Sequence, residues 1–113
     1  MTAAITNLII EPGATFQRNI ALSDENGQPL AVAGFTANGE IRTDYYSSNS
    51  VIAVFQTNLT DGNLSLRLEA NVTTTFPVGF EPLVYDVYMS NGTDVYRIAE
   101  GLIVVDPGTG VSV

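Results

Sequence analysis

The side chains best suited to metal binding lie in three short polar turns. Carboxylate and amide oxygens are ligands that Ca²⁺ accepts, and they occur in Asp24-Glu25-Asn26-Gly27, Asp61-Gly62-Asn63 and Asn91-Gly92-Thr93-Asp94. None of these turns has the twelve-residue spacing of an EF-hand loop with its terminal bidentate glutamate. Asp, Asn and Gly are also the residues that tight turns require. We therefore expect ordinary turns there, and neither a metal nor another cofactor.

Pairs of carboxylates are the second source of chemistry, because glycoside hydrolysis uses two Asp or Glu side chains several ångströms apart. The chain has twelve acidic residues. Most of them fall in turns or on the polar faces of expected strands, and nothing indicates a buried pair whose pKa values differ. We therefore expect a protein that is not an enzyme. A carboxylate hydrolase is the less favoured alternative and requires a cleft that holds such a pair.

The residue types that are missing exclude much other chemistry. The chain has no Cys and no His, and its four basic residues are all arginines. Thiol nucleophiles, imidazole bases and lysine Schiff bases are therefore impossible. The formal net charge of −8 opposes binding to nucleic acid and to anionic membranes. No apolar run approaches the roughly 20 residues of a membrane-spanning helix, and the N-terminal residues do not resemble a signal peptide.

Two segments are suited to contacts with other proteins. Tyr45 and Tyr46 lie in the polar stretch 44–50, where exposed rings give contact area at low entropic cost. Val111 and Val113 belong to the tail 108–113, and both would enter one groove if the tail added a strand to a neighbouring subunit. Alternatively, one tyrosine covers a sheet edge and the tail is flexible. We take these four residues as the candidate interface.

The elements that must position these residues are short β-strands. Leu64, Leu66 and Leu68 alternate with polar residues, which predicts a strand with one buried face. The alternating run 51–59 precedes it, and Asp61-Gly62 between them supplies the positive φ angles of a tight hairpin turn. The run 73–79 is expected to be an irregular or one-turn crossover.

A second hairpin is predicted from strands at 83–89 and 95–105. Tyr96, Ile98, Leu102 and Val104 share one face of the return strand. Glu100 falls in the same register, and a bulge at Glu100-Gly101 would turn its carboxylate outward and change the phase beyond it. In the first strand, Tyr85 is expected to be a core aromatic, with a tyrosine corner as the alternative.

The first half of the chain adds strands at 5–10, 15–23 and 35–42. Phe16, Ile20 and Leu22 share one face of the second of these strands, with Arg18 between them. About seven strands in one domain over residues 1–107 predict an all-β fold, a single immunoglobulin-like antiparallel β-sandwich. A small β-barrel is the alternative closure.

The order of several short motifs resembles a known family. These motifs are Glu11-Pro12-Gly13-Ala14-Thr15-Phe16, Val32-Ala33-Gly34-Phe35-Thr36, Ile41-Arg42, Tyr85-Asp86-Val87, Tyr96-Arg97-Ile98 and Glu100-Gly101-Leu102-Ile103-Val104-Val105. Their order and spacing, from about Ile9 to Pro107, are similar to small β-sandwich domains in the structural proteins of tailed bacteriophages. The likeness is strongest to cyanophage structural proteins and to the N-terminal domain of baseplate upper proteins.

The resemblance implies a part of the virion, assembled in the host cytoplasm, with no catalytic residue to carry over. Its partners would be capsid, tail or baseplate proteins and copies of itself in a symmetric assembly. In the family the domain often continues into more chain, whereas here six residues follow Pro107, which favours an accessory piece. The alternative function is a small carbohydrate- or host-receptor-binding module, which requires several tyrosines on one concave patch.

Overall fold

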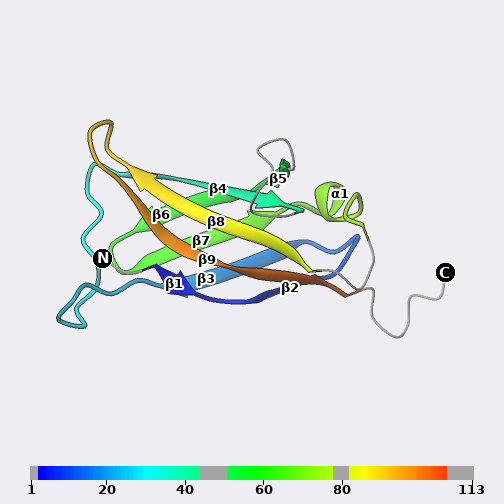
Figure 1. Ribbon diagram of the computed structural model, residues 1–113, viewed down its shortest axis with the longest axis horizontal. Coiled ribbons are helices and arrows are strands. Elements are labelled where there is room, and N and C mark those ends of the chain that lie inside the picture. Colours follow the sequence, from blue (N-terminus) through cyan, green and yellow to red (C-terminus); the bar gives the residue numbers. More distant parts are fainter. Residues whose placement is uncertain (1–2, 44–50, 78–81, 107–113) are drawn as a thin grey trace.

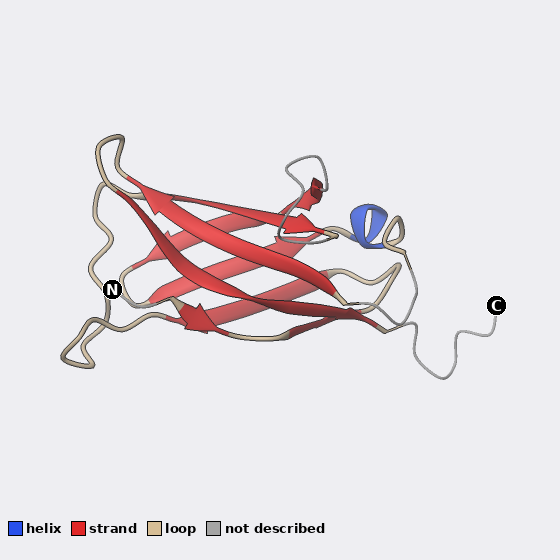
Figure 2. Cartoon of the chain, viewed as in Figure 1, coloured by secondary structure: helices blue, strands red, loops and turns tan. Residues whose placement is uncertain are grey.

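The larger of two β-sheets contains both ends of the described chain (Figures 1 and 2). The computed structural model describes residues 3–43, 51–77 and 82–106. In hydrogen-bonded order the larger sheet consists of β1 (Ala4–Ile5), β9 (Val95–Val105), β8 (Leu83–Ser90), β4 (Thr36–Arg42) and β5 (Val51–Val54), and β2 (Leu8–Ile10) also pairs with β9.

The smaller sheet packs against the larger one and completes a sandwich. Its hydrogen-bonded order is β3 (Phe16–Ala21), β7 (Asn63–Leu68) and β6 (Gln56–Thr60). Because each sheet has one apolar face, the two faces bury each other. The predicted all-β sandwich is confirmed, and two separate sheets replace the alternative of a closed barrel.

The strand order is immunoglobulin-like. β1 with β2 and β5 with β6 are each one interrupted stretch, so the described residues form seven stretches of strand. β3, β7 and β6 occupy the positions of strands B, E and D, and β9, β8, β4 and β5 those of G, F, C and C′. One pairing in the sandwich is parallel, because β1 and β2 run parallel to β9.

The chain passes from one sheet to the other at Phe55. Its backbone N–H donates to the carbonyl of Gly39 at 2.9 Å, and its ring is buried between the sheets. A Cβ atom at position 39 would lie 3.1 Å from that ring and 3.0 Å from Val87. Glycine at position 39 therefore lets the crossing strand pack closely on β4.

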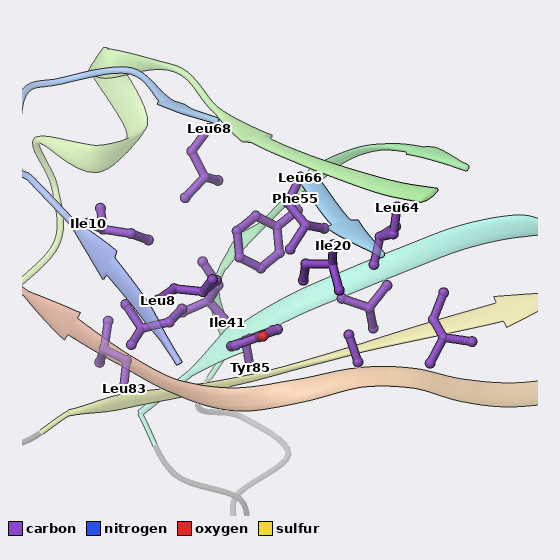
Figure 3. Packing of buried hydrophobic residues seen from close by; sticks show 14 of the residues in the cluster. Leu8, Ile10, Ile20, Ile41, Phe55, Leu64, Leu66, Leu68, Leu83 and Tyr85 are labelled. Atoms are coloured by element: carbon purple, nitrogen blue, oxygen red, sulfur yellow. The ribbon is translucent and has the colours of Figure 1, made fainter. Parts of the chain in front are cut away.

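The core lies between the two sheets, and Figure 3 shows its packing. Leu64, Leu66 and Leu68 of β7 all point inward, as their alternation predicts, and are at most 1% exposed. Ile20 of β3, in the same sheet, and Ile41 of β4, in the larger sheet, belong to the same core cluster. The side chains drawn and labelled in Figure 3 are Leu8, Ile10, Ile20, Ile41, Phe55, Leu64, Leu66, Leu68, Leu83 and Tyr85.

Tyr85 is a core aromatic with a polar tip. Its ring contacts Phe55 edge to face, with centroids 5.8 Å apart. Its hydroxyl donates to the carbonyl of Thr6, on the stretch between β1 and β2. A tyrosine corner bonds to backbone a few residues upstream, so this contact across 79 residues is of a different kind.

β1 and β2 are separated where the backbone passes closest to β9. A Cβ atom at Gly101 would lie 2.1 Å from the carbonyl oxygen of Thr6. The Asn7 side chain accepts a hydrogen bond from the N–H of Leu102 at 3.1 Å, in place of a ladder bond. Gly101 is thus required by close approach rather than by a bulge.

The predicted bulge in β9 lies at another residue. Val87 pairs with Ala99 and Tyr88 with Arg97, so Ile98 is the extra residue and Glu100-Gly101 continues in register. Ile98 and Ala99 are both buried, and the inward positions beyond them are odd-numbered. The prediction that Leu102 and Val104 share a face with Ile98 is therefore wrong, and both side chains point outward.

The connections agree with the turn chemistry of the sequence. Gly62, at φ +77°, closes the predicted hairpin between β6 and β7. The crossover to β8 contains a single helical turn, α1 (Ala70–Thr73), which begins three residues before the predicted segment. In the described part of the chain, no helix has the length and the apolar composition that membrane crossing demands.

Candidate protein-docking face

All four predicted interface residues lie outside the described residues. Tyr45 and Tyr46 belong to the segment 44–50, and Val111 and Val113 to the segment 107–113. Their role in contacts with partners stays a prediction. The described residues instead present a surface that the sequence analysis did not single out.

This surface, which we call the docking face, is the outer face of the larger sheet. Cross-strand partners share a face, so the pairing of Ile9 with Val104 and of Glu40 with both Asp86 and Val54 fixes which side chains point outward. Seven of the nine large apolar side chains that the described residues expose lie on this one face. They are Ile5, Ile9, Val54, Tyr88, Val95, Leu102 and Val104.

The apolar side chains are densest over β1, β2 and β9. Ile9 is 63% exposed and Val104, directly opposite, is 50% exposed. Leu102 extends the strip along β9, and its cross-strand partner is Val84 of β8. A contiguous exposed apolar strip at a sheet edge is typical of a surface that another protein covers.

A row of charged side chains crosses the middle of the same face. Asp86 of β8 stands opposite Glu40 of β4 on one side and Glu100 of β9 on the other. Arg42 donates to Glu40 Oε1 at 2.7 Å, and Arg97 donates to Glu100 Oε2 at 3.1 Å. Three carboxylates and two guanidinium groups therefore form a nearly neutral network beside the apolar strip.

Asp86 is the buried centre of this network. The whole residue is 9% exposed, and the nearest Arg42 nitrogen lies 3.7 Å from its Oδ1 atom, which forms no hydrogen bond within the described residues. Burial raises the pKa of the Asp86 carboxyl above its ordinary value of 3.8. Arg42 and Arg97 lower the pKa in part, while Glu40 and Glu100 raise it further.

Tyr88 and Arg97 form the exposed end of the network. The guanidinium carbon of Arg97 lies 5.9 Å from the centroid of the Tyr88 ring, within the range of a cation–π contact. Tyr88 and then Glu100 raise the pKa of Arg97, so this side chain stays charged. Tyrosine and arginine are both enriched where proteins meet, so this end of the face is suited to a polar rim.

In the turns considered for calcium, side-chain oxygens accept hydrogen bonds from backbone N–H groups. Asp24 Oδ1 accepts from the N–H groups of Asn26 and Gln28, and Asp61 Oδ1 accepts from Val32 at 2.9 Å. Asn91 Oδ1 accepts from Thr93 and Asp94 in the same way. Within residues 3–43, 51–77 and 82–106, no group of three or more acidic side chains is arranged to hold a metal ion.

The described tyrosines do not share one patch. Tyr85 is buried in the core, and Tyr88 lies on the docking face. Tyr96 pairs with Met89, whose side chain points inward, and it packs on Phe35 at the other side of the sheet. No two of the three described tyrosines therefore share one exposed surface.

Comparison with known protein families and with curated proteins gives no match to this chain.

Sequence alone missed the docking face for a physical reason. A bulge at Ile98 reverses which residues of β9 point outward, and periodicity read across Val95–Val105 assigns Leu102 and Val104 to the core. The charged row was missed because Glu40, Asp86 and Glu100 meet only through strand order and register. Even so, Asp86 is a signal that a pattern search can find, as a charged residue within an otherwise apolar run from 83 to 87.

Proposed function

We propose that this chain is a non-enzymatic structural protein of a tailed-bacteriophage virion. It docks as an accessory piece on other virion proteins, either decorating and cementing the capsid or attaching at the tail, neck or baseplate. The sequence resemblance supports the phage assignment. The concentration of exposed apolar side chains on one sheet face supports a role in docking and is the observation on which the proposal rests.

The docking face combines the features that stable protein contacts use. Covering Ile9, Leu102 and Val104 contributes about 1 kcal/mol each, since each still exposes 40% or more of its surface. The charged row beside them fixes orientation, because a partner docked in the wrong place would bring its own charges against like charges of this row. An apolar strip with a charged flank is therefore suited to a partner that is held in one register.

The rest of the molecule serves as a rigid support for this face. Each strand of the larger sheet is buried on its inner side against the smaller sheet, and Tyr85 ties β8 to the edge stretch through Thr6. Such a block changes little in shape on binding. Repetition of one contact by the symmetry of a particle then multiplies a modest affinity.

Quantitative mass spectrometry of purified virus particles from the source of this sequence tests the proposal. We expect the chain at a fixed copy number relative to the major capsid protein, and retained after washing in high salt because the central contacts are apolar. Absence from the particles would contradict the proposal. So would saturable binding of the purified chain to glycans together with absence from particles, because that result favours the alternative of a receptor-binding module.

A further inference from the structure

The two sheets are joined differently at their two sides. On one side the chain crosses from β5 to β6 at Phe55, and the backbone bond from Phe55 to Gly39 holds the sheets together. On the other side β2 and β3 are connected by the turn at 11–15, and the described residues show no ladder between them. We call this open side the seam.

A shallow groove lies in the seam where β2 ends and β3 begins. Its volume is about 290 Å³, and Ile9, Glu11, Phe16 and Arg18 are among the residues that line it. Ile9 and Phe16 provide apolar walls, and Phe16 is half-buried with its ring 6.1 Å from that of Phe55. Glu11 and Arg18 place one charge of each sign at the rim.

The groove runs along an edge strand. Within the described residues β3 pairs with β7 alone, over the six residues from Phe16 to Ala21. Alternate N–H and C=O groups of such a strand point away from its partner and can accept another strand. The Arg18 side chain is exposed at this edge, and a charge there discourages indiscriminate pairing.

The chain supplies a segment whose sequence suits this groove. Residues 107–113 include no charged side chain, and Val111 and Val113 are spaced to share one face of an extended strand. The segment follows Asp106, whose N–H donates to the carbonyl of Ile10 at 2.9 Å, so the described chain ends beside the groove end of β2. Seven extended residues reach about 23 Å, enough for the roughly 20 Å of β3.

We propose that residues 107–113 of a second copy add to the edge of β3 as a strand, with Val111 and Val113 against Ile9 and Phe16. Strand direction favours a second copy over the same chain. A segment that turned back onto its own β3 would run parallel to it, and parallel pairing is less stable per residue than antiparallel pairing. A segment from a second copy can pair antiparallel over its full length. The inference rests on the proposed role in a repeated assembly, and it names one contact between copies.

Site-specific crosslinking tests this contact cleanly, because the chain has no cysteine of its own. One full-length protein carries Arg18→Cys and another carries Val111→Cys, and the two are mixed under mild oxidation. We expect a covalent dimer of about twice 12.0 kDa, at least about tenfold more abundant than in a control mix. The control replaces Arg18→Cys with Asn58→Cys, on the exposed edge strand at the far side of the smaller sheet.

Two further results would overturn the proposal. One is dimer formation no greater than in the control mix. The other is a disulfide that forms within single chains when both cysteines are placed in one protein, since that places the segment on its own β3. The mixtures contain purified protein alone, so failure here contradicts strand addition without touching the virion assignment, and particle composition tests that assignment separately.

Light scattering adds a measurement that needs no new bond. Val111→Asn with Val113→Asn should weaken self-association at least about tenfold, whereas Gly110→Asn with Ser112→Asn should not. The protein with Val111→Asn and Val113→Asn keeps an intact groove, and a protein with Ile9→Asn keeps an intact segment 107–113. A mixture of the two should therefore form one intact contact and give a mixed dimer. Equal self-association of both tail variants, or a monomer at every concentration for the unaltered chain, would contradict the proposal.

Discussion

Gly101 is the residue at which the fold has least room for a side chain. A Cβ atom there would lie 2.1 Å from the Thr6 carbonyl oxygen, which belongs to the backbone. The backbone also fixes the position of a Cβ atom, so neither group can rotate away. Gly101→Ala should lower the free energy of unfolding by about 3 kcal/mol, because β1 must move off β9. Denaturant unfolding followed by circular dichroism measures this.

Gly27→Ala is the matched control for that substitution. Gly27 has φ +77° but open space around its Cβ position, so alanine there costs only the strained backbone, about 1 kcal/mol. Equal losses of stability in the two variants would contradict the close approach between Gly101 and Thr6.

Asp86 gives the fold a pH dependence whose sign can be stated. Burial raises its pKa above 3.8, so the folded state favours the protonated carboxyl. The resulting stabilisation is fully present below the unfolded value of 3.8 and is lost as pH rises through the raised folded value. Arg42 faces the carboxyl from β4 and Arg97 from β9, and these two cations moderate the effect, whereas Glu40 and Glu100 on the same two strands reinforce it.

The stability difference between the unaltered chain and Asp86→Asn should therefore depend on pH. As the pH falls from about 7 to about 3.5, we expect the unaltered chain to gain stability relative to the variant. The reason is that the Asp86 carboxyl takes up a proton in this range, whereas the asparagine of the variant cannot. Urea unfolding of both proteins at the two pH values measures the difference. Identical pH profiles would show that the carboxyl is not perturbed.

At the scale of elements, Thr73 connects α1 to the turn before β3. Its Oγ1 accepts from the N–H of Gly13 at 3.1 Å and donates to the carbonyl of Ala14 at 2.8 Å, and the residue is fully buried. Thr73→Val keeps the shape but leaves two backbone groups without these partners. We expect a loss of about 1–3 kcal/mol in the free energy of unfolding.

Thr75→Val provides the comparison for this element. Thr75 is exposed, and among the described residues its hydroxyl bonds only to the nearby carbonyl of Val72. Its substitution should change stability by less than about 0.5 kcal/mol. If both variants lose the same stability, the tie between α1 and the turn does not hold the sandwich together.

The elements also show what the sequence could and could not predict. Alternation located β7 and its hairpin with β6, because a two-residue period and Asp61-Gly62 act over short distances. Alternation failed at Ile98, where one extra residue shifts the register of β9 against β8. It also could not reveal that β1 and β2 run parallel to β9, since strand order depends on contacts about 95 residues apart.

At the scale of the whole molecule, the docking face should be separable from stability. Leu102→Gln with Val104→Gln replaces two exposed apolar side chains, so the free energy of unfolding should fall by less than about 1 kcal/mol. The copy number in particles that carry this variant should nevertheless fall severalfold, because the apolar contact is lost. Mass spectrometry of purified particles measures it.

Asn58→Gln is the control for the docking face, since Asn58 is exposed on β6, at the edge of the smaller sheet away from β3. It should leave the copy number unchanged. A fall of the same size in both variants would mean that docking does not depend on the outer face of the larger sheet.

A cryo-EM map of the particle that resolves this chain tests the central claim most directly. We expect repeated copies in which Ile9, Leu102 and Val104 touch another virion protein, with the charged row of Glu40, Asp86 and Glu100 alongside that contact. A map in which this face is open to solvent in every copy would contradict the account.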